Sequence, residues 1–237
     1  MRVENEDYFL DPPPGSAAER AVELGIDLTL TLENLRLTPE ERIRQLDDHL
    51  DGIAELKANA QSSSPTSPIT AWTQAPKGAI GRQLKWLAEA GIDCVIVDDL
   101  AGALQGSSSL TRLLAVCYLR NAPNVLRLGN ALTSVHARPR GTADAFSFHW
   151  DAEVLDGLQD LKLMTDLGPV DLRSEVNGVG FYEDAIVGAK WLALFGHEFP
   201  VLEISKLIVA KRTAGRAKDL IAVAELEAVL SAKANHG

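Results

Sequence analysis

The second half of the chain alternates short apolar runs with amphipathic stretches, and this alternation constrains the fold more than any other feature. Two apolar runs, at residues 92–97 (IDCVIV) and 113–119 (LLAVCYL), are typical of buried strands. Residues 83–90 and 125–135 carry apolar side chains at helical spacing. Helices interleaved with short strands predict an α/β fold in which helices flank a mixed sheet.

Further elements are expected around these runs. The helix at 83–90 should end at Gly91, because glycine suits the left-handed conformation that follows many helices. The other expected elements are a helix beginning within 100–104, strands at 161–165 and 170–173 joined at Gly168-Pro169, a strand at 189–195, and helices at about 203–214 and 218–232.

Residues 38–58 predict one amphipathic helix in the first part of the chain. Thr38 can cap it, Pro39 suits its first position, and Glu41 completes a capping box. The apolar residues form one narrow stripe, namely Ile43, Leu46, Leu50, Ile53 and, beside them, Leu56. A helix cannot bury such a stripe by itself, so it must pack against the main domain or against a second chain.

Charge and composition divide the chain into three parts. Residues 1–60 hold 14 acidic and 6 basic side chains, a balance of −8, whereas the other 177 residues hold 19 and 17, a balance of −2. Residues 60–79 are rich in Ser, Pro and Thr, which is typical of a linker. We therefore expect an acidic N-terminal segment (1–59), a linker (60–79) and a main domain (80–237). The acidity argues only weakly against a phosphate-bearing ligand for the main domain.

Several classes of protein are disfavoured by the sequence. No apolar run reaches the roughly 18 residues that span a bilayer, and the acidic N-terminus lacks the layout of a secretory signal. We therefore expect a cytoplasmic protein without a membrane partner. Cys94 and Cys117 lie in expected strands and should be small buried hydrophobes. The histidines lack metal-ligand spacing, and no phosphate-loop or G-x-S-x-G motif is present.

The order of segments carries a resemblance to a known family. A helix ending in AEAGID precedes the strand CVIV, then LAGALQGSSSLTR and a second strand, and much later LIVAKRTAGRAKDL. Residues 82–232 thus resemble the small nucleotidyltransferases of the DNA polymerase β-like superfamily, in particular the bacterial toxin–antitoxin and abortive-infection group. The most specific piece is KR-x-A-G-R-x-K-D-L at 211–220, and LAGALQGS at 100–107 comes second. The resemblance implies the mixed sheet and flanking helices of a nucleotidyltransferase.

The resemblance also implies a set of site residues. After the first strand, such proteins have a glycine pair, because backbone N–H groups must approach a triphosphate closely. The next strand carries two aspartates separated by one residue, which alternation places on one face. With a third aspartate on a neighbouring strand, they hold two Mg²⁺ ions through hard oxygen ligands.

The sequence departs from that pattern at decisive positions. Asp98-Asp99 align with the glycine pair, Leu113 and Ala115 align with the paired aspartates, and only the third aspartate is retained, as Asp171. Leucine and alanine offer no oxygen to Mg²⁺. Carboxylates at a phosphate loop also repel a triphosphate, by about 4 kcal/mol for each charge pair at 4 Å and an effective dielectric near 20. Ordinary two-metal nucleotidyl transfer is therefore not expected.

Each candidate residue has two interpretations. Asp98 and Asp99 form a substitute metal site with Asp171, or they are solvated residues of a turn. Asp171 keeps a role as a catalytic metal ligand, or it is a vestige. Ser107 offers its hydroxyl to a phosphate, or it caps the next element.

The basic cluster also has two interpretations. Lys211, Arg212, Arg216 and the nearby Lys218 contact phosphate or acceptor, as the resemblance suggests. Alternatively, these cations favour a helix end and pair with neighbouring acids.

Two functional hypotheses follow. The favoured one is a non-catalytic nucleotidyltransferase-like protein, a pseudoenzyme that binds a protein partner or a nucleotide in a toxin–antitoxin or phage-defence setting. The alternative is an active enzyme that uses Mg²⁺ and unconventional ligands to transfer a nucleoside monophosphate to RNA or protein. Substitutions engineered to silence a toxin are a third, less favoured explanation.

The N-terminal segment carries a second, weaker resemblance. Residues 27–58 resemble small proteins encoded beside such nucleotidyltransferases, mainly through ENLRLTPEER. A partner-like element fused to the main domain would dock within the chain at high effective concentration and cover a basic surface there. The 38–58 helix is otherwise a candidate for binding a separate protein or for self-association.

Overall fold

A computed structural model describes residues 6–60, 78–142, 148–157 and 159–234. Most of the expected linker at 60–79 lies outside these residues. In the part of the chain that the structure describes, no helix is both long enough and apolar enough to cross a membrane.

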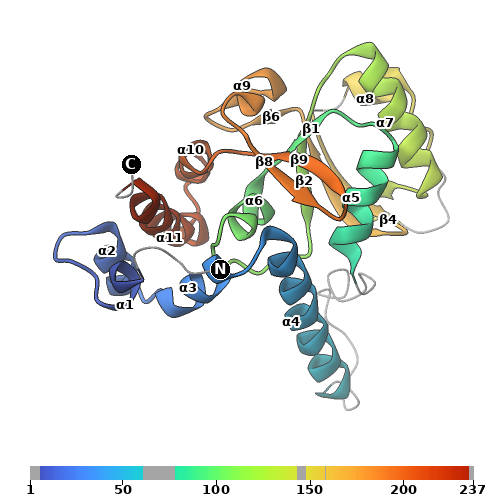
Figure 1. Cartoon of the computed structure of the whole chain (residues 1–237). Coiled ribbons are helices and arrows are strands. Elements are labelled where there is room, and N and C mark those ends of the chain that lie inside the picture. Colours follow the sequence, from blue (N-terminus) through green and yellow to red (C-terminus); the bar gives the residue numbers. More distant parts are fainter. Residues whose placement is uncertain (1–5, 61–77, 143–147, 158, 235–237) are drawn as a thin grey trace.

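The centre of the fold is a seven-stranded mixed sheet with the strand order β3-β4-β5-β2-β1-β9-β8 (Figure 1). β1 runs antiparallel to β2 and parallel to β9, and β2 runs parallel to β5. The strands of this sheet are β1 (Cys94–Ile96), β2 (Leu114–Tyr118), β3 (Arg138–Pro139), β4 (Asp160–Thr165), β5 (Gly168–Arg173), β8 (Lys190–Leu194) and β9 (His197–Val201). A separate pair consists of β6 (Glu175–Val176) and β7 (Gly180–Phe181). The α/β class with a mixed sheet is therefore confirmed.

The helices lie around this sheet. They are α1 (Asp7–Leu10), α2 (Ala17–Glu23), α3 (Leu28–Arg36), α4 (Pro39–Ala60), α5 (Ala79–Glu89), α6 (Asp98–Leu104), α7 (Ala122–Ser134), α8 (Ala152–Gly157), α9 (Tyr182–Ile186), α10 (Ile204–Ala214) and α11 (Ala217–Ala234). Every residue of β1 and β2 is buried, as their apolar runs predict. Burial raises the pKa of the Cys94 and Cys117 thiols to about 12.

The structure contains elements that the sequence analysis did not expect, namely α1–α3, α8, α9, β3, β6, β7 and β9, and it moves the β4–β5 turn. The β4–β5 turn is formed by residues 166–167, whereas Gly168, with φ of 117°, is already part of β5. β9 contains Pro200, a residue type that is unusual within strands because it has no backbone N–H donor. The helices α1–α3 were also missed, although the Ser16 side chain caps α2 and the Asp27 side chain caps α3. Such short helices depend on packing against distant parts of the chain.

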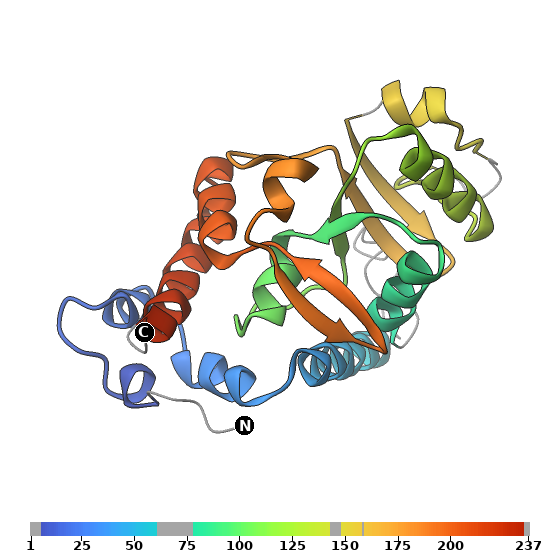
Figure 2. The ribbon, with the colours of Figure 1, turned by 45° about the horizontal axis from the view of Figure 1, so that its top comes forward.

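The amphipathic helix α4 begins as its sequence predicts. The Glu41 amide donates to the Thr38 hydroxyl over 3.3 Å, and the Thr38 amide donates to the Glu41 carboxylate over 2.7 Å, which is a capping box. Figure 2 shows α4 running beneath the sheet, beside β8 and α5.

The stripe on α4 faces the main domain along the first half of the helix. Ile43 and Leu46 belong to the main core, with 1% and 5% of their surface exposed. Leu50 is half-buried against the same core, whereas Ile53 is exposed. The side chain of Leu56 lies outside the described residues. The stripe therefore packs against the main domain from Ile43 to Leu50.

Beside this stripe lies a buried carboxyl group, Asp47, from which we expect the stability of the folded chain to depend on pH. Asp47 is 9% exposed, and its pKa is raised from 3.8 to about 6 by burial and by the nearby Asp51 charge, while Arg112 opposes the shift. A raised folded-state pKa means that the protonated form favours folding, so stability is lost as the pH rises from about 4 through 6.

We expect Asp47→Asn to raise the free energy of unfolding at pH 8 but to change it little at pH 4. The shift corresponds to about 3 kcal/mol, and solvent screening reduces the expected gain to about 1 kcal/mol. Urea denaturation at several pH values measures the difference. The exposed neighbour Asp48 provides the control, since Asp48→Asn should have no comparable effect. An equal gain at pH 4 and pH 8 would contradict the explanation.

Candidate functional site

The candidate residues of β5 lie on one face of the sheet. Asp171 is paired with Ala115 of β2 on one side and with Lys162 of β4 on the other. Arg173, two residues further along β5, is paired with Asp160. Residues two apart on a strand share a face, and paired residues lie side by side, so these five side chains project from the same face.

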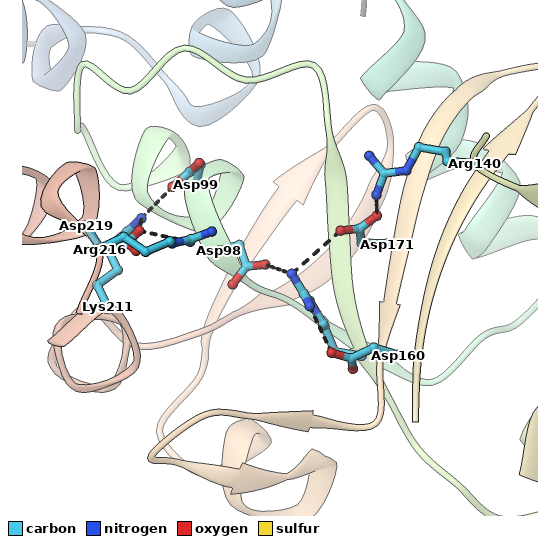
Figure 3. A network of polar contacts seen from close by, with 9 residues as sticks. Asp98, Asp99, Arg140, Asp160, Asp171, Lys211, Arg216 and Asp219 are labelled. Carbon is cyan, nitrogen blue, oxygen red and sulfur yellow. Dashed lines mark hydrogen bonds and ion pairs between the residues drawn. The ribbon is translucent and has the colours of Figure 1, made fainter. Parts of the chain in front are cut away.

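Asp171 is buried between two arginines. Its side chain is 3% exposed, its Oδ1 accepts a hydrogen bond from Arg140 Nη2, and its Oδ2 lies 3.6 Å from Arg173 Nη2. Arg140 follows β3, and its backbone amide donates to the Lys162 carbonyl over 2.8 Å, which holds it beside β4. Two guanidinium groups from separate elements therefore flank one buried carboxylate (Figure 3).

Arg173 connects this carboxylate to two further aspartates. Its Nη2 lies 3.0 Å from Asp98 Oδ2, and its Nη1 lies 2.9 Å from Asp160 Oδ2. Asp98 is the first residue of α6 and has a positive φ of 57°, which is uncommon for a residue other than glycine. The positive charge of Arg173 thus links α6 to β4 and β5.

The electrostatics of Asp171 reflect opposing effects. Burial raises the pKa of this carboxyl group, whereas the positive charges of Arg140, Arg173 and Lys162 lower it. Both of its oxygens face guanidinium groups, so a divalent cation would have to displace an arginine to reach either one.

The surrounding residues do not fit a two-metal site. Leu113 lies just before β2, Ala115 is buried opposite Asp171, and neither side chain has an oxygen. Among the described residues, no group of three or more His, Cys, Asp or Glu side chains is arranged to hold a metal ion. Mg²⁺ requires several hard oxygen ligands, and the carboxylates of Asp98, Asp160 and Asp171 are each already paired with an arginine.

A second ion-pair cluster lies at the other side of α6. Lys211 of α10 is 7% exposed, contacts Asp99, and lies 3.9 Å from Asp219 of α11. Asp219 is 3% exposed and accepts two hydrogen bonds from Arg216, of 2.5 and 3.1 Å. This cluster joins α6, α10 and α11 (Figure 3), so these basic side chains have internal partners, whereas Arg212 pairs with Glu227 at the surface.

The structure therefore sorts the predicted residues into three groups. Asp98 and Asp171 meet through Arg173, whereas Asp99 joins the Lys211 cluster. Ser107 lies beyond the other end of α6, where its hydroxyl donates to Glu225 over 2.7 Å. The three aspartates that were expected to form one substitute metal site are thus divided between two clusters, and Ser107 belongs to neither.

Sequence reasoning missed Arg140, Arg173 and Asp160 as parts of the site. The alternation of side chains along β5 could have predicted Arg173, since residues two apart on a strand share a face and Arg173 is two residues from Asp171. Arg140 reaches the site from a different hairpin, and no local pattern indicates its position. Comparisons of the chain with models of protein families, with curated proteins and with solved structures found no match.

Proposed function

We propose that this chain is a nucleotidyltransferase-like binding protein that does not carry out two-metal nucleotidyl transfer. One observation carries the proposal. Asp171, the single carboxylate retained from the pattern described above, lies beside Ala115 and has a guanidinium group at each oxygen. The carboxylates near this site, Asp98, Asp160 and Asp171, are all paired with arginines, whereas a two-metal enzyme keeps its carboxylates open to the metal ions.

The arrangement of strands supports the family assignment within this proposal. The resemblance implies that the paired and third aspartates stand on neighbouring strands and share a face. Ala115 on β2 and Asp171 on β5 are neighbours on parallel strands and share a face. The expected positions are therefore adjacent, and Ala115 offers no carboxylate at one of them.

The arginines support binding of a phosphate-bearing ligand, such as a nucleotide, or of an acidic partner. Guanidinium groups bind phosphate through planar pairs of N–H donors and require no metal ion. Arg140 and Arg173 are 18% and 26% exposed, so part of each is open to solvent. We propose that Asp171 orients both arginines and that a ligand replaces the exposed Asp98 or Asp160 as the partner of Arg173.

The proposal predicts that no nucleotide is transferred and that any nucleotide binding is independent of Mg²⁺. The protein is incubated with labelled nucleoside triphosphates, Mg²⁺ or Mn²⁺, and total tRNA or cell extract. We expect no label on RNA or protein. Filter binding of the same nucleotides should give equal retention in Mg²⁺ and in EDTA.

Two variants make this test specific. Arg173→Gln removes a charge from the site, whereas Arg127→Gln removes one from an exposed pair with Asp93 elsewhere on the surface. Retention should fall about tenfold for the first variant only, as expected for a charge-assisted contact. Label transfer that disappears in Asp171→Asn, which keeps the shape of the side chain, would overturn the proposal in favour of an active transferase.

A further inference from the structure

The N-terminal residues 6–51, here called the arm, lie across the rest of the chain along α11, the end of α6 and the loop that follows it (Figure 2). Their first contact is a hydrophobic cluster separate from the main core. It comprises Tyr8, Phe9, Ala18, Ala21, Leu28 and Leu32 of the arm with Ala224, Ala228 and Ala232 of α11. The small alanine side chains let the arm helices approach α11 closely. The buried residues of this cluster are separate from the main core that contains the sheet.

Glu225, on the same helix α11, joins the arm to residues 105–112, here called the loop. This carboxylate is 4% exposed and accepts hydrogen bonds from the Thr31 hydroxyl (2.6 Å), the Ser107 hydroxyl (2.7 Å) and the Ser108 amide (2.6 Å). Thr31 belongs to the arm, and the other two donors belong to the loop. All three donors are neutral, so a carboxylate removed from water depends on each of them.

Helix α3 also contacts the loop directly. Asn34 Nδ2 donates to the Ser107 carbonyl over 3.1 Å. The side chain of Leu35 lies over Gly106, which has a φ of +112°. A Cβ atom at Gly106 would lie 2.3 Å from Leu35 Cδ2, so the arm occupies the space that any larger residue would need.

The far end of the loop is attached to α4. Arg112 is 7% exposed, and its Nη2 lies 2.7 Å from Asp51 Oδ1 on the arm. The next residues lead into β2, where Ala115 stands beside Asp171. The arm thus holds the loop at both ends, and the loop leads directly to the candidate site.

The contact between arm and loop is incomplete. A pocket of about 360 Å³, open to solvent, lies between α3, α4 and the loop. Leu30 and Leu110, on its two sides, are 50% and 54% exposed. Side chains that face this pocket add little dispersion energy to the contact, so the contact opens at lower cost than a close-packed core.

We propose that the arm is an intramolecular clamp, that Glu225 is the joint between arm and loop, and that α1–α3 and the loop are released together. Helix α4 and the sheet remain folded, because Ile43 and Leu46 of α4 are buried in the main core. Release exposes the Ser107–Ser109 segment. These contacts between arm and loop do not depend on whether the candidate site binds a nucleotide.

Hydrogen exchange of the full chain, followed by mass spectrometry, tests the clamp. Gly106→Ala places a methyl group against Leu35 at a positive φ, so it should lift α3 from the loop. We expect exchange in α3 and in the loop to become about tenfold faster, with β4 and β5 unchanged. Gly141→Ala is the matched control, since Gly141 has a φ of +89° and open space around it.

A milder variant tests the joint itself. Thr31→Val keeps the shape of the side chain but removes a donor from Glu225, so exchange at the Ser108 amide should accelerate. In the control Thr29→Val, the lost hydroxyl donates to the exposed Asp27, and Ser108 should be unaffected. If α3 opens while the loop keeps its protection, the joint does not exist. If arm, loop and sheet accelerate together in both variants, or if Thr31→Val leaves the loop unchanged, the clamp is likewise overturned.

Discussion

Asp171→Ala is expected to lower the free energy of unfolding by about 3–5 kcal/mol, the cost of removing one partner from a buried ion pair. Asp171 is 3% exposed, and its removal takes away the carboxylate that accepts a hydrogen bond from Arg140 Nη2 and lies 3.6 Å from Arg173 Nη2. Arg173 is less affected, because Asp98 and Asp160 remain beside it. Urea denaturation monitored by circular dichroism gives the free energy and shows whether the transition stays two-state.

A double-mutant cycle separates the charge effect from simple loss of packing. The double variant Asp171→Leu/Arg140→Leu removes both partners. Its free energy of unfolding should lie close to that of the unchanged protein, above that of either single variant, since a buried pair is often replaceable by apolar side chains. Asp171→Asn provides an isosteric comparison that keeps the shape and removes the charge. If Asp171→Ala costs less than about 1 kcal/mol, the pair behaves as a surface ion pair, and the description of the site as a buried carboxylate held by arginines is wrong.

The sheet was largely predictable from sequence because its central strands are buried on both faces. β1 and β2 are continuous apolar runs, and the Thr38–Glu41 capping box fixed the start of α4. β9 contains a proline, and α1–α3 are short helices that are stabilised by α11, nearly two hundred residues away in sequence. Local patterns carry no information about such long-range packing, so these elements were missed.

The site was less predictable than the fold for the same reason. The sequence indicates which residue types are absent from the expected metal positions, and Leu113 and Ala115 can be recognised in this way. It does not indicate which charges take their place. Arg140 reaches Asp171 only because β3 pairs with β4, which in turn pairs with β5. The nucleotidyltransferase assignment stays a prediction, and it depends on the adjacency of Ala115 and Asp171.

The most recognisable sequence element, at 211–220, illustrates how a motif can be structural. Within it, Lys211 binds Asp99 of α6, and Arg216 binds Asp219 at the beginning of α11. Gly215 has a φ of 64° and ends α10, so the chain can turn into α11. The spacing of Lys211, Gly215 and Arg216 is thus explained by contacts that join α6, α10 and α11, and it requires no ligand.

Lys211→Met should therefore cost about 3 kcal/mol of stability, near the low end for a buried pair, because Asp219 keeps Arg216 as a second partner. Arg212→Ala, at the neighbouring position, removes a side chain that is 58% exposed and should cost less than about 1 kcal/mol. Denaturation of the two variants side by side measures the contrast. If Lys211 holds the three helices together, its removal must lower the free energy of unfolding. Equal, small losses of stability in the two variants would therefore contradict the structural role. Weaker nucleotide retention in both variants would then identify the element as a ligand-binding motif.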